Sequence, residues 1–402
     1  MRDGWKIFRI KDVATVVTGT TPSSQSSDNW GTGIPFLTPS DMSESDYEIT
    51  TSRHLSEKSA EKLKSRIISH EATAVVCIGA TIGKVARITK PTLTNQQINT
   101  VVPRAELLNS KFSYYILQTL AVHFRQIAGG SATPLLNKTR FELVEFCLPP
   151  LDDQQKIAKA LGAFDDLIAL NNSIRNELVT LGEAIVRNLS KSNAYPVFPL
   201  ESLVSSTLSG VWGSDTPAPD LSPMQVVRGI DLASFRKLEE SVPPLRYIPS
   251  SQVESRTLKV GDLIIEGSGS NCGRGWVPLA GQLHRSTTPM TFSNFCKRFK
   301  LNIADKEIGP RYIQHWLNIA YESGALDQFR SGTAMPNLDV QSLLRLVNVP
   351  IGAGILKSEK TLARLDEASD RLHQESLELA SYRDEILPLL ISGEIKVKDI
   401  AA

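Results

Sequence analysis

The sequence feature that most constrains the fold is a heptad repeat that occurs twice, at residues 152–193 and again within residues 352–402. Apolar side chains at alternating steps of three and four form the seam along which helices pair. The seam residues are Ile157, Leu161, Phe164, Ile168, Asn171, Leu178 and Ile185 in the first stretch, and Leu362, Leu365, Leu372, Leu379 and Ile386 in the second. The numbers of Leu161 and Leu362 differ by 201, and the same shift relates the later pairs. One helix of this kind fits an ordinary bundle, but the shared register predicts a duplicated unit.

Length and composition predict a soluble protein with two domains and connectors. The chain has 402 residues, of which 41% are hydrophobic and 22% charged, as in globular proteins. No apolar run approaches the roughly 18 residues of a membrane span, and residues 1–12 lack the apolar core of a signal peptide. We therefore expect a cytoplasmic protein. The four cysteines include no Cys-x-x-Cys pair, which favours buried thiols over zinc ligands or disulfides.

The segments that precede the two helices also resemble each other. Residues 66–79 and 256–269 are apolar strands that enter a glycine loop, and both loops end on a glycine followed by a cation, Lys84 or Arg274. Short β-branched runs between Gly, Pro, Asn and Ser, with one or two helices, predict α+β domains. The expected divisions are a globular domain, a long helix, a second globular domain and a second long helix with a tail, at residues 1–151, 152–193, 194–351 and 352–402.

A search for catalytic chemistry finds no motif. The loop from Gly79 to Lys84 has three residues between its glycines, and Val85 stands where a phosphate loop needs Ser or Thr. No Asn-Pro-Pro or Asp-Pro-Pro precedes an aromatic residue, as it does in adenine methyltransferases, and the six histidines lack metal-ligand spacing. The pattern favours a protein that recognises something at two places and has no catalytic or metal-binding residues of its own. An active site assembled from distant residues stays open as an alternative.

Three features together resemble the specificity subunits of type I restriction-modification systems. They are the Gln154-Gln-Lys-Ile-Ala158 entry to the first helix, the Gly79 to Lys84 loop followed by Thr94-Asn-Gln-Gln97, and the duplication itself. The resemblance covers essentially the whole chain, although the second helix entry near Ser358 has diverged. It implies an α+β fold with two pseudo-repeated target recognition domains, separated by two long antiparallel coiled-coil helices.

The resemblance also implies the partners and cofactors of the complex. Each recognition domain reads one half of a bipartite, asymmetric double-stranded DNA target, and the helices set the spacing and provide docking surface for two methyltransferase subunits. Those subunits bind S-adenosylmethionine and methylate adenine N6, while restriction subunits use ATP and Mg²⁺ to translocate and cut DNA. The chain itself would bind no cofactor and no membrane. A helix of 38 residues is about 57 Å long, so we expect half-sites about one helical turn apart.

Seven residues are the candidates for DNA contacts. Lys84 and Arg274 follow the glycine loops and suit phosphates or bases, unless they are only exposed cations. The amides of Asn95, Gln96 and Gln97 could pair with adenine edges, or equally cap backbone groups at a strand end. Arg285 and Thr287 are candidates of lower rank, as is the polar loop 20–25.

Three other functions remain open. The chain could serve a methyltransferase-only or type IIB system, which neighbouring reading frames would reveal. It could be a coiled-coil scaffold without a DNA role, which predicts no salt-dependent DNA affinity. An enzyme with dispersed catalytic residues predicts activity in the isolated chain.

Overall fold

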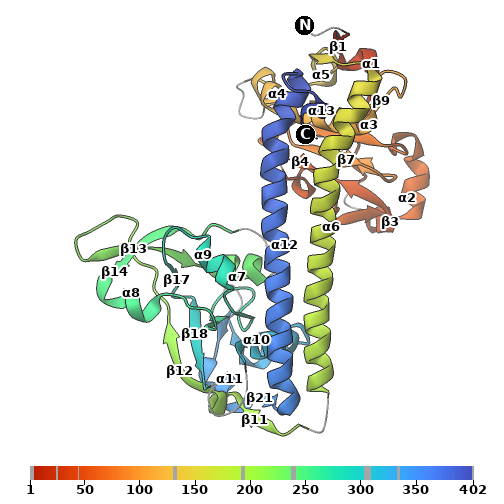
Figure 1. Ribbon diagram of the computed structural model, residues 1–402. Helices are drawn as coiled ribbons and strands as arrows, with labels where there is room; N and C mark the ends of the chain where they lie inside the picture. The colour runs from red at the N-terminus through yellow and green to blue at the C-terminus, as the bar shows by residue number, and fades with distance from the viewer. Residues whose placement is uncertain are drawn as a thin grey trace. The chain divides into compact units, whose positions relative to one another are not determined.

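A computed structural model describes residues 4–23, 26–43, 45–129, 134–191, 195–236, 241–302, 309–332 and 336–400. The chain forms two compact units, which are described separately. Unit 1 comprises Met1–Leu170 and Leu377–Ala402, and unit 2 comprises Asn171–Ser376. The long helices α6 (Leu151–Ser190) and α12 (Ala353–Ser392), labelled in Figure 1, each contribute one half to each unit.

The halves of α6 and α12 pack together inside each unit. In unit 1, Ile157 and Leu161 near the start of α6 share a core with Leu387 and Leu390 near the end of α12. In unit 2, the end of α6 meets the start of α12, because Val186 shares a core with Ile355 and Leu362. The start of one helix therefore packs against the end of the other, so the halves run antiparallel within each unit. The expected α+β fold with two long paired helices is confirmed.

All twelve predicted seam residues are at least partly buried. Those that are buried are Ile157, Leu161, Asn171 and Leu362, and those that are half-buried are Phe164, Ile168, Leu178, Ile185, Leu365, Leu372, Leu379 and Ile386. Polar side chains also occupy the inward face, since Arg175, Ser369 and Ser376 are buried. The role of the seam in helix pairing stays a prediction for each single residue.

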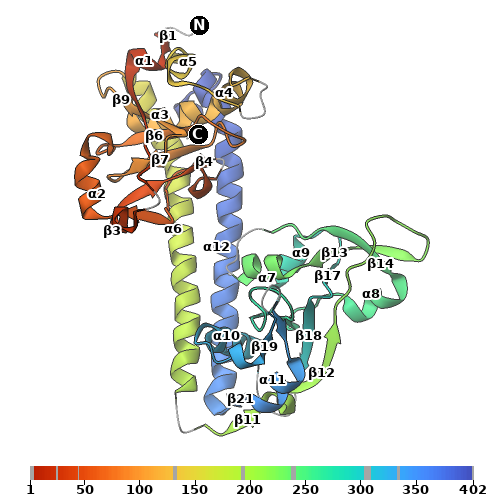
Figure 2. The ribbon, with the colours of Figure 1, turned by 180° about the vertical axis from the view of Figure 1, so that it is seen from behind.

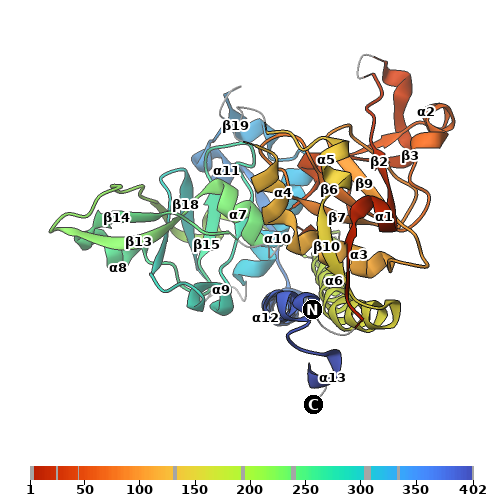
Figure 3. The same ribbon diagram turned by 90° about the horizontal axis from the view of Figure 1, so that it is seen from above.

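In its described residues, unit 1 combines three sheets with short helices. Its elements besides the long helices are β1 (Lys6–Arg9), α1 (Ile10–Val13), β2 (Ala14–Thr18), β3 (Trp30–Leu37), β4 (Ser45–Asp46), β5 (Arg53–Leu55), α2 (Glu57–Lys62), β6 (Ala72–Val76), β7 (Val85–Ile88), β8 (Leu93–Thr94), β9 (Ile98–Pro103), α3 (Ser110–Thr119), α4 (Ala121–Ile127), α5 (Lys138–Glu142), β10 (Glu145–Leu148) and α13 (Val397–Ile400). Figure 3 shows β6, β7 and β9 beside one another. Strand β6 is buried on both faces, which explains its continuous apolar and β-branched sequence.

Unit 2 has a closely related set of elements, seen from behind in Figure 2. They are β11 (Val197–Pro199), β12 (Val204–Ser209), β13 (Leu221–Val227), α7 (Gly229–Arg236), β14 (Leu245–Pro249), α8 (Ser250–Arg256), β15 (Leu263–Glu266), β16 (Gly275–Trp276), α9 (Ala280–His284), β17 (Met290–Phe292), β18 (Cys296–Leu301), α10 (Pro310–Glu322), β19 (Arg330–Ser331), β20 (Asn337–Leu338), α11 (Val340–Leu346) and β21 (Asn348–Pro350). The buried strand β15 corresponds to β6.

The two units share one strand topology, which confirms the duplication. The order β2-β9-β6-β7 in unit 1 matches β12-β18-β15-β16 in unit 2, and β5-β3-β8 matches β14-β13-β17. In each three-stranded sheet the last pair is parallel, β3 with β8 and β13 with β17. The first strand of each unit pairs antiparallel with the strand before the long helix, β1 with β10 and β11 with β21.

Polar groups of the long helices cap backbone groups of the globular parts. Gln154, in the distinctive entry to α6, accepts a hydrogen bond from the backbone N–H of Asn109, which precedes α3 (2.9 Å), and donates to the carbonyls of Leu107 and Pro149 (3.0 and 2.9 Å). In unit 2 the carboxylate of Glu359 accepts from the N–H groups of Arg311 and Tyr312 at the start of α10. The first backbone N–H groups of a helix have no partner within the helix, so Glu359 satisfies two of them at the start of α10.

Candidate nucleic-acid interface

The two glycine loops are hairpin loops with the same hydrogen bonds. The Gly83 N–H donates to the Val76 carbonyl (3.0 Å), and the Gly273 N–H donates to the Glu266 carbonyl (2.8 Å). Gly83 and Gly273 have φ of 92° and 101°, a region that favours glycine. Each loop joins two antiparallel strands, β6 to β7 and β15 to β16. The glycines therefore satisfy hairpin geometry.

The cations that follow the glycine loops contact their own unit. Lys84 is half-buried, and its ammonium donates to the carbonyl of Met42. The Arg274 guanidinium lies 2.5 Å from the Glu322 carboxylate and stacks over Tyr321 at 4.9 Å from the ring centre. A DNA contact by either cation has to compete with these interactions. Their role in DNA binding stays a prediction.

The second glycine loop surrounds a buried carboxylate that has an apolar counterpart, Val76, in unit 1. A Glu266 oxygen accepts from the Asn271 N–H (3.3 Å), and a Cβ on Gly269 would lie 2.7 Å from that oxygen. Burial raises the pKa of Glu266, against the attraction of Arg236. Burial likewise lowers the pKa of Arg236 to about 10. This pair belongs to the interior of unit 2.

The turn between β8 and β9 consists of Asn95, Gln96 and Gln97. The Asn95 side chain accepts from the Gln97 N–H (2.7 Å) and donates to the Thr21 hydroxyl (3.2 Å), so it caps the turn. Gln96 is exposed, and its side-chain carbonyl accepts from the Thr21 hydroxyl. The structure therefore brings this turn together with the polar loop after β2. Residues 24 and 25 of that loop lie outside the described residues.

The lower-ranked candidates have different surroundings. Arg285 follows α9, and its guanidinium binds both oxygens of Asp370 on α12, at 2.8 and 3.2 Å. The guanidinium thus joins the end of α9 to the long helix within unit 2. Thr287 is exposed two residues later. Contact of either residue with DNA stays a prediction.

A turn that the sequence search missed corresponds to Asn95–Gln97. Ser293, Asn294 and Phe295 connect β17 to β18 in unit 2, as Asn95, Gln96 and Gln97 connect β8 to β9 in unit 1. Asn294 and Phe295 are exposed, and Phe295 has 46% of its surface accessible. The residues share no sequence pattern with their counterparts, so only the common backbone pairing identifies the relation.

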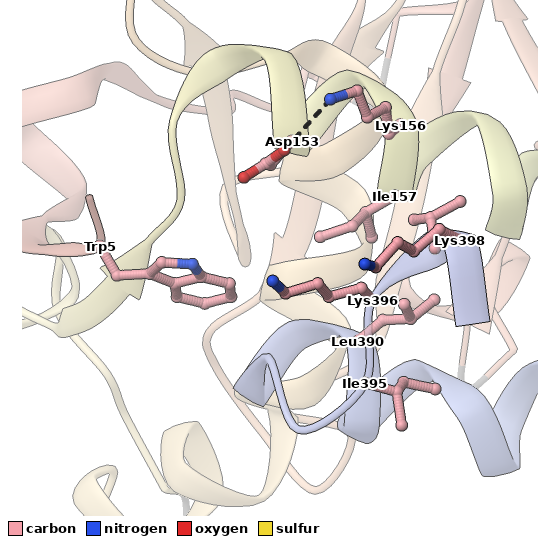
Figure 4. Close-up of a pocket in the computed structure, with 9 residues that line it drawn as sticks. Trp5, Asp153, Lys156, Ile157, Leu390, Ile395, Lys396 and Lys398 are labelled. Atoms are coloured by element: carbon pink, nitrogen blue, oxygen red, sulfur yellow. Dashed lines mark hydrogen bonds and ion pairs between the residues drawn. The ribbon is translucent and has the colours of Figure 1, made fainter. Parts of the chain in front are cut away.

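A pocket of about 550 Å³ in unit 1 is lined by lysine side chains from separate parts of the chain (Figure 4). Its lining residues are Trp5, Asp153, Lys156, Ile157, Leu390, Ile395, Lys396, Val397 and Lys398. The Lys396 ammonium is directed toward the Trp5 indole in Figure 4, and Lys156 pairs with Asp153 at 3.4 Å. The pocket combines apolar side chains with three ammonium groups and one carboxylate, which suits an anionic partner.

Within the described ranges, no three His, Cys, Asp or Glu side chains are arranged to hold a metal. In the same ranges, no helix is both long enough and apolar enough to cross a membrane.

Comparisons with known proteins give one match to the first part of the chain. Residues 2–180 match the family model described as "Type I restriction modification DNA specificity domain". The type I restriction enzyme MjaIX specificity subunit of Methanocaldococcus jannaschii is 34% identical over 179 residues, which are 44% of this chain and 41% of that relative. This match therefore spans less than half of the relative's length.

Two further matches span nearly the whole chain. The MjaVIII specificity subunit of the same organism is 21% identical over 99% of this chain and 94% of its own. The crystal structure of a type I restriction-modification system S subunit from M. genitalium is 15% identical, covers 97% of each chain and has a TM-score of 0.54. The last comparison concerns the fold alone.

Proposed function

We propose that this chain is a specificity subunit of the type I restriction-modification family and that it recognises a bipartite, asymmetric DNA sequence. The observation that carries the proposal is the duplicated strand topology of the two units. Residues 2–180 match a DNA specificity domain, and unit 2 repeats that architecture with other side chains on its loops. Two equivalent scaffolds with different surfaces favour two different half-sites.

Catalysis in this proposal belongs to partner subunits. Two methyltransferase subunits carry S-adenosylmethionine and methylate adenine N6, and restriction subunits supply ATP- and Mg²⁺-dependent cleavage. The specificity chain binds double-stranded DNA and brings these subunits to the target without a cofactor of its own. Its place is the cytoplasm, where the DNA and the partners are found.

The long helices support a fixed spacing between the half-sites. A helix of 40 residues, such as α6 or α12, is about 60 Å long at 1.5 Å per residue. That length is enough to span the roughly 34–36 Å of one DNA turn, after which the major groove faces the same side of the duplex again. We therefore propose half-site centres about one turn apart.

We also propose that the lysine-lined pocket of unit 1 receives an acidic segment of the methyltransferase subunit. Lys156, Lys396 and Lys398 outnumber the single carboxylate of Asp153. The apolar side chains of the lining suit a peptide with an apolar side chain between acidic ones. This pocket lies where the start of α6 meets the C-terminal segment of unit 1.

The proposed function is tested by co-expressing the chain with its neighbouring methyltransferase gene and mapping N6-methyladenine across the host genome. We expect one bipartite motif with a constant spacer, lost when this chain is omitted. A verified, soluble complex that leaves the DNA unmodified would contradict the proposal. Cleavage of unmodified target DNA after addition of a restriction subunit would distinguish a type I system from a methyltransferase-only one.

A further inference from the structure

We infer that both units read their half-sites with one equivalent edge, and that Asn294, Phe295 and Trp212 are the specificity-determining residues of unit 2. This edge consists of the loop after β2 or β12 and the turn after β8 or β17. The inference rests on the proposed function, since it assumes that each unit binds DNA. It adds two aromatic residues, Phe295 and Trp212, whose counterparts in unit 1 are polar.

The loop after the first sheet strand has the same position in both units. The Thr20 N–H donates to the Thr94 carbonyl (2.8 Å), and the Val211 N–H donates to the Phe292 carbonyl (2.9 Å). The preceding glycines, Gly19 and Gly210, lie so close to the neighbouring strand that a Cβ on either would overlap two backbone carbonyl oxygens. Thr21 and Trp212 are therefore equivalent positions.

The turn beside this loop is equivalent as well. The Ile98 N–H donates to the Asn95 carbonyl (3.0 Å), as the Cys296 N–H donates to the Ser293 carbonyl (2.9 Å). The Gln97 carbonyl accepts from Cys77 (2.8 Å). The Phe295 carbonyl accepts from Gly267 (2.7 Å). Gln96 therefore corresponds to Asn294, and Gln97 to Phe295.

One arginine accompanies each edge. The Arg66 guanidinium donates to the Thr18 carbonyl at the end of β2 (3.5 Å), and the Arg256 guanidinium donates to the Ser209 carbonyl at the end of β12 (3.3 Å). Arg66 is exposed and Arg256 half-exposed. A cation beside an exposed amide combines a phosphate contact, which fixes position, with a base contact, which carries specificity.

The exposed side chains suit base recognition with different chemistry in the two units. In unit 1 the edge presents Gln96 and Thr21, which are polar. In unit 2 it presents Asn294 with two large apolar side chains, Phe295 at 46% and Trp212 at 37% exposure. Asn and Gln pair with adenine in the major groove, whereas an aromatic side chain contacts the thymine methyl group. The two edges therefore favour different half-sites.

Trp212 is held in place from within unit 2. The Arg246 guanidinium stacks on its ring, 4.5 Å from the ring centre, and also donates to the carbonyls of Trp212 and Gly213. A fixed aromatic side chain loses little freedom on binding, which favours its use as a contact. The cations after the glycine loops, by contrast, are occupied by Met42 and Glu322.

The test uses the chain in complex with its methyltransferase subunit. It compares the unit 2 variants Phe295→Ala and Asn294→Ala with the unit 1 variant Gln96→Ala. For each complex, N6-methyladenine is mapped and the affinity for the wild-type target is measured. Each variant should weaken binding about tenfold and relax the motif in one half-site only. The two unit 2 variants should affect one half-site, and Gln96→Ala should affect the other. Leu346→Ala is the matched control, because Leu346 is 65% exposed on α11 of unit 2.

Different outcomes distinguish a failure of the equivalent edge from a failure of the proposed function. If the wild-type complex methylates a bipartite motif and all three variants keep that motif and affinity, the equivalent-edge inference is wrong while the proposed function stands. If a unit 2 variant alters both half-sites and still melts like the wild type, the inference is also wrong. Absence of methylation by the wild-type complex contradicts the proposed function itself. Substituting Arg66 or Arg256 by alanine should lower the salt slope of binding by about one.

Discussion

At the residue scale, Tyr115, Asp165 and Arg383 join α3 to both long helices within unit 1. Asp165 accepts from the Tyr115 hydroxyl (2.5 Å) and pairs with the Arg383 guanidinium, and its side chain is 2% exposed. Burial raises the pKa of Asp165, although Arg383 and Tyr115 favour its charged form. Burial and the nearby carboxylate likewise raise the pKa of Tyr115. Ionised Asp165 therefore carries a desolvation cost, which Arg383 and Tyr115 offset in part.

Arg383→Met should destabilise unit 1 by about 3–5 kcal/mol at pH 7, because it leaves a buried carboxylate without its cation. The raised pKa means that the folded state binds more protons than the unfolded state, so stability falls as pH rises from the ordinary carboxyl range through the folded pKa. Lowering the pH to 5 should therefore reduce the defect of the variant. Urea denaturation at both pH values, with hydrogen exchange of α3 peptides to localise the effect, checks the prediction.

The control for this prediction is the double variant Asp165→Asn, Arg383→Met. In this variant the side-chain amide oxygen at position 165 can still accept a hydrogen bond from Tyr115 but carries no charge, so much of the lost stability should return. An equal defect at pH 5 and pH 7, or no recovery in the double variant, would show that the ion pair is not the cause.

At the element scale, the long helices carry a polar stretch on their inward face. Asn171 is buried in unit 2 and, within the described part of the chain, its amide nitrogen has no hydrogen-bond partner. The same holds for the hydroxyl of Ser369 on α12. His373 on α12 is also buried, and burial together with Arg175 and Arg285 lowers its pKa to about 4. A buried polar residue on a seam lowers stability but penalises slipped registers.

Asn171→Leu should raise the free energy of unfolding of unit 2 by about 1 kcal/mol, because it removes a buried donor that lacks a partner. Asn176→Leu on the same helix is the matched control, since Asn176 is exposed and its replacement should change stability by less than about 0.5 kcal/mol. Thermal and urea unfolding measure both variants. A destabilised Asn171→Leu protein would mean that the seam requires the amide for packing.

At the scale of the whole molecule, both ends of the chain belong to unit 1, where α6 begins and α12 ends. The lysine-lined pocket lies in that region and brings together Trp5, Lys156 and Lys396 from distant parts of the sequence. The proposed methyltransferase contact therefore depends on residues near both termini. The proposed complex requires such a surface in addition to the proposed DNA-binding edges.

The double variant Lys396→Glu, Lys398→Glu should weaken association with the methyltransferase subunit by about tenfold or more, because it reverses two charges that face the proposed acidic segment. Lys62→Glu, an exposed position on α2, is the control for a change in net charge. Affinity is measured by titration of the purified subunits at two salt concentrations. Unchanged affinity in a folded double variant would exclude the pocket as the contact.

The sequence alone predicted the architecture, because the features that encode it are local and repeated. Heptad spacing predicted α6 and α12, whose bounds are Leu151–Ser190 and Ala353–Ser392, against the expected 152–193 and, with a tail included, 352–402. Strands followed by glycine loops predicted the duplicated α+β units, since turn chemistry depends on a few adjacent residues. The four-part functional division stays a prediction, while the compact units divide each helix between them.

Only the tertiary structure decided which polar side chains remain available for DNA. Lys84, Arg274 and Arg285 look alike in sequence, yet they contact Met42, Glu322 and Asp370, which are 42, 48 and 85 positions away in the chain. The equivalence of Asn294 and Phe295 with Gln96 and Gln97 likewise required the backbone pairing of separate strands. Periodicity and turns follow from neighbouring residues, whereas ion pairs and exposed edges depend on contacts that form only when the chain has folded.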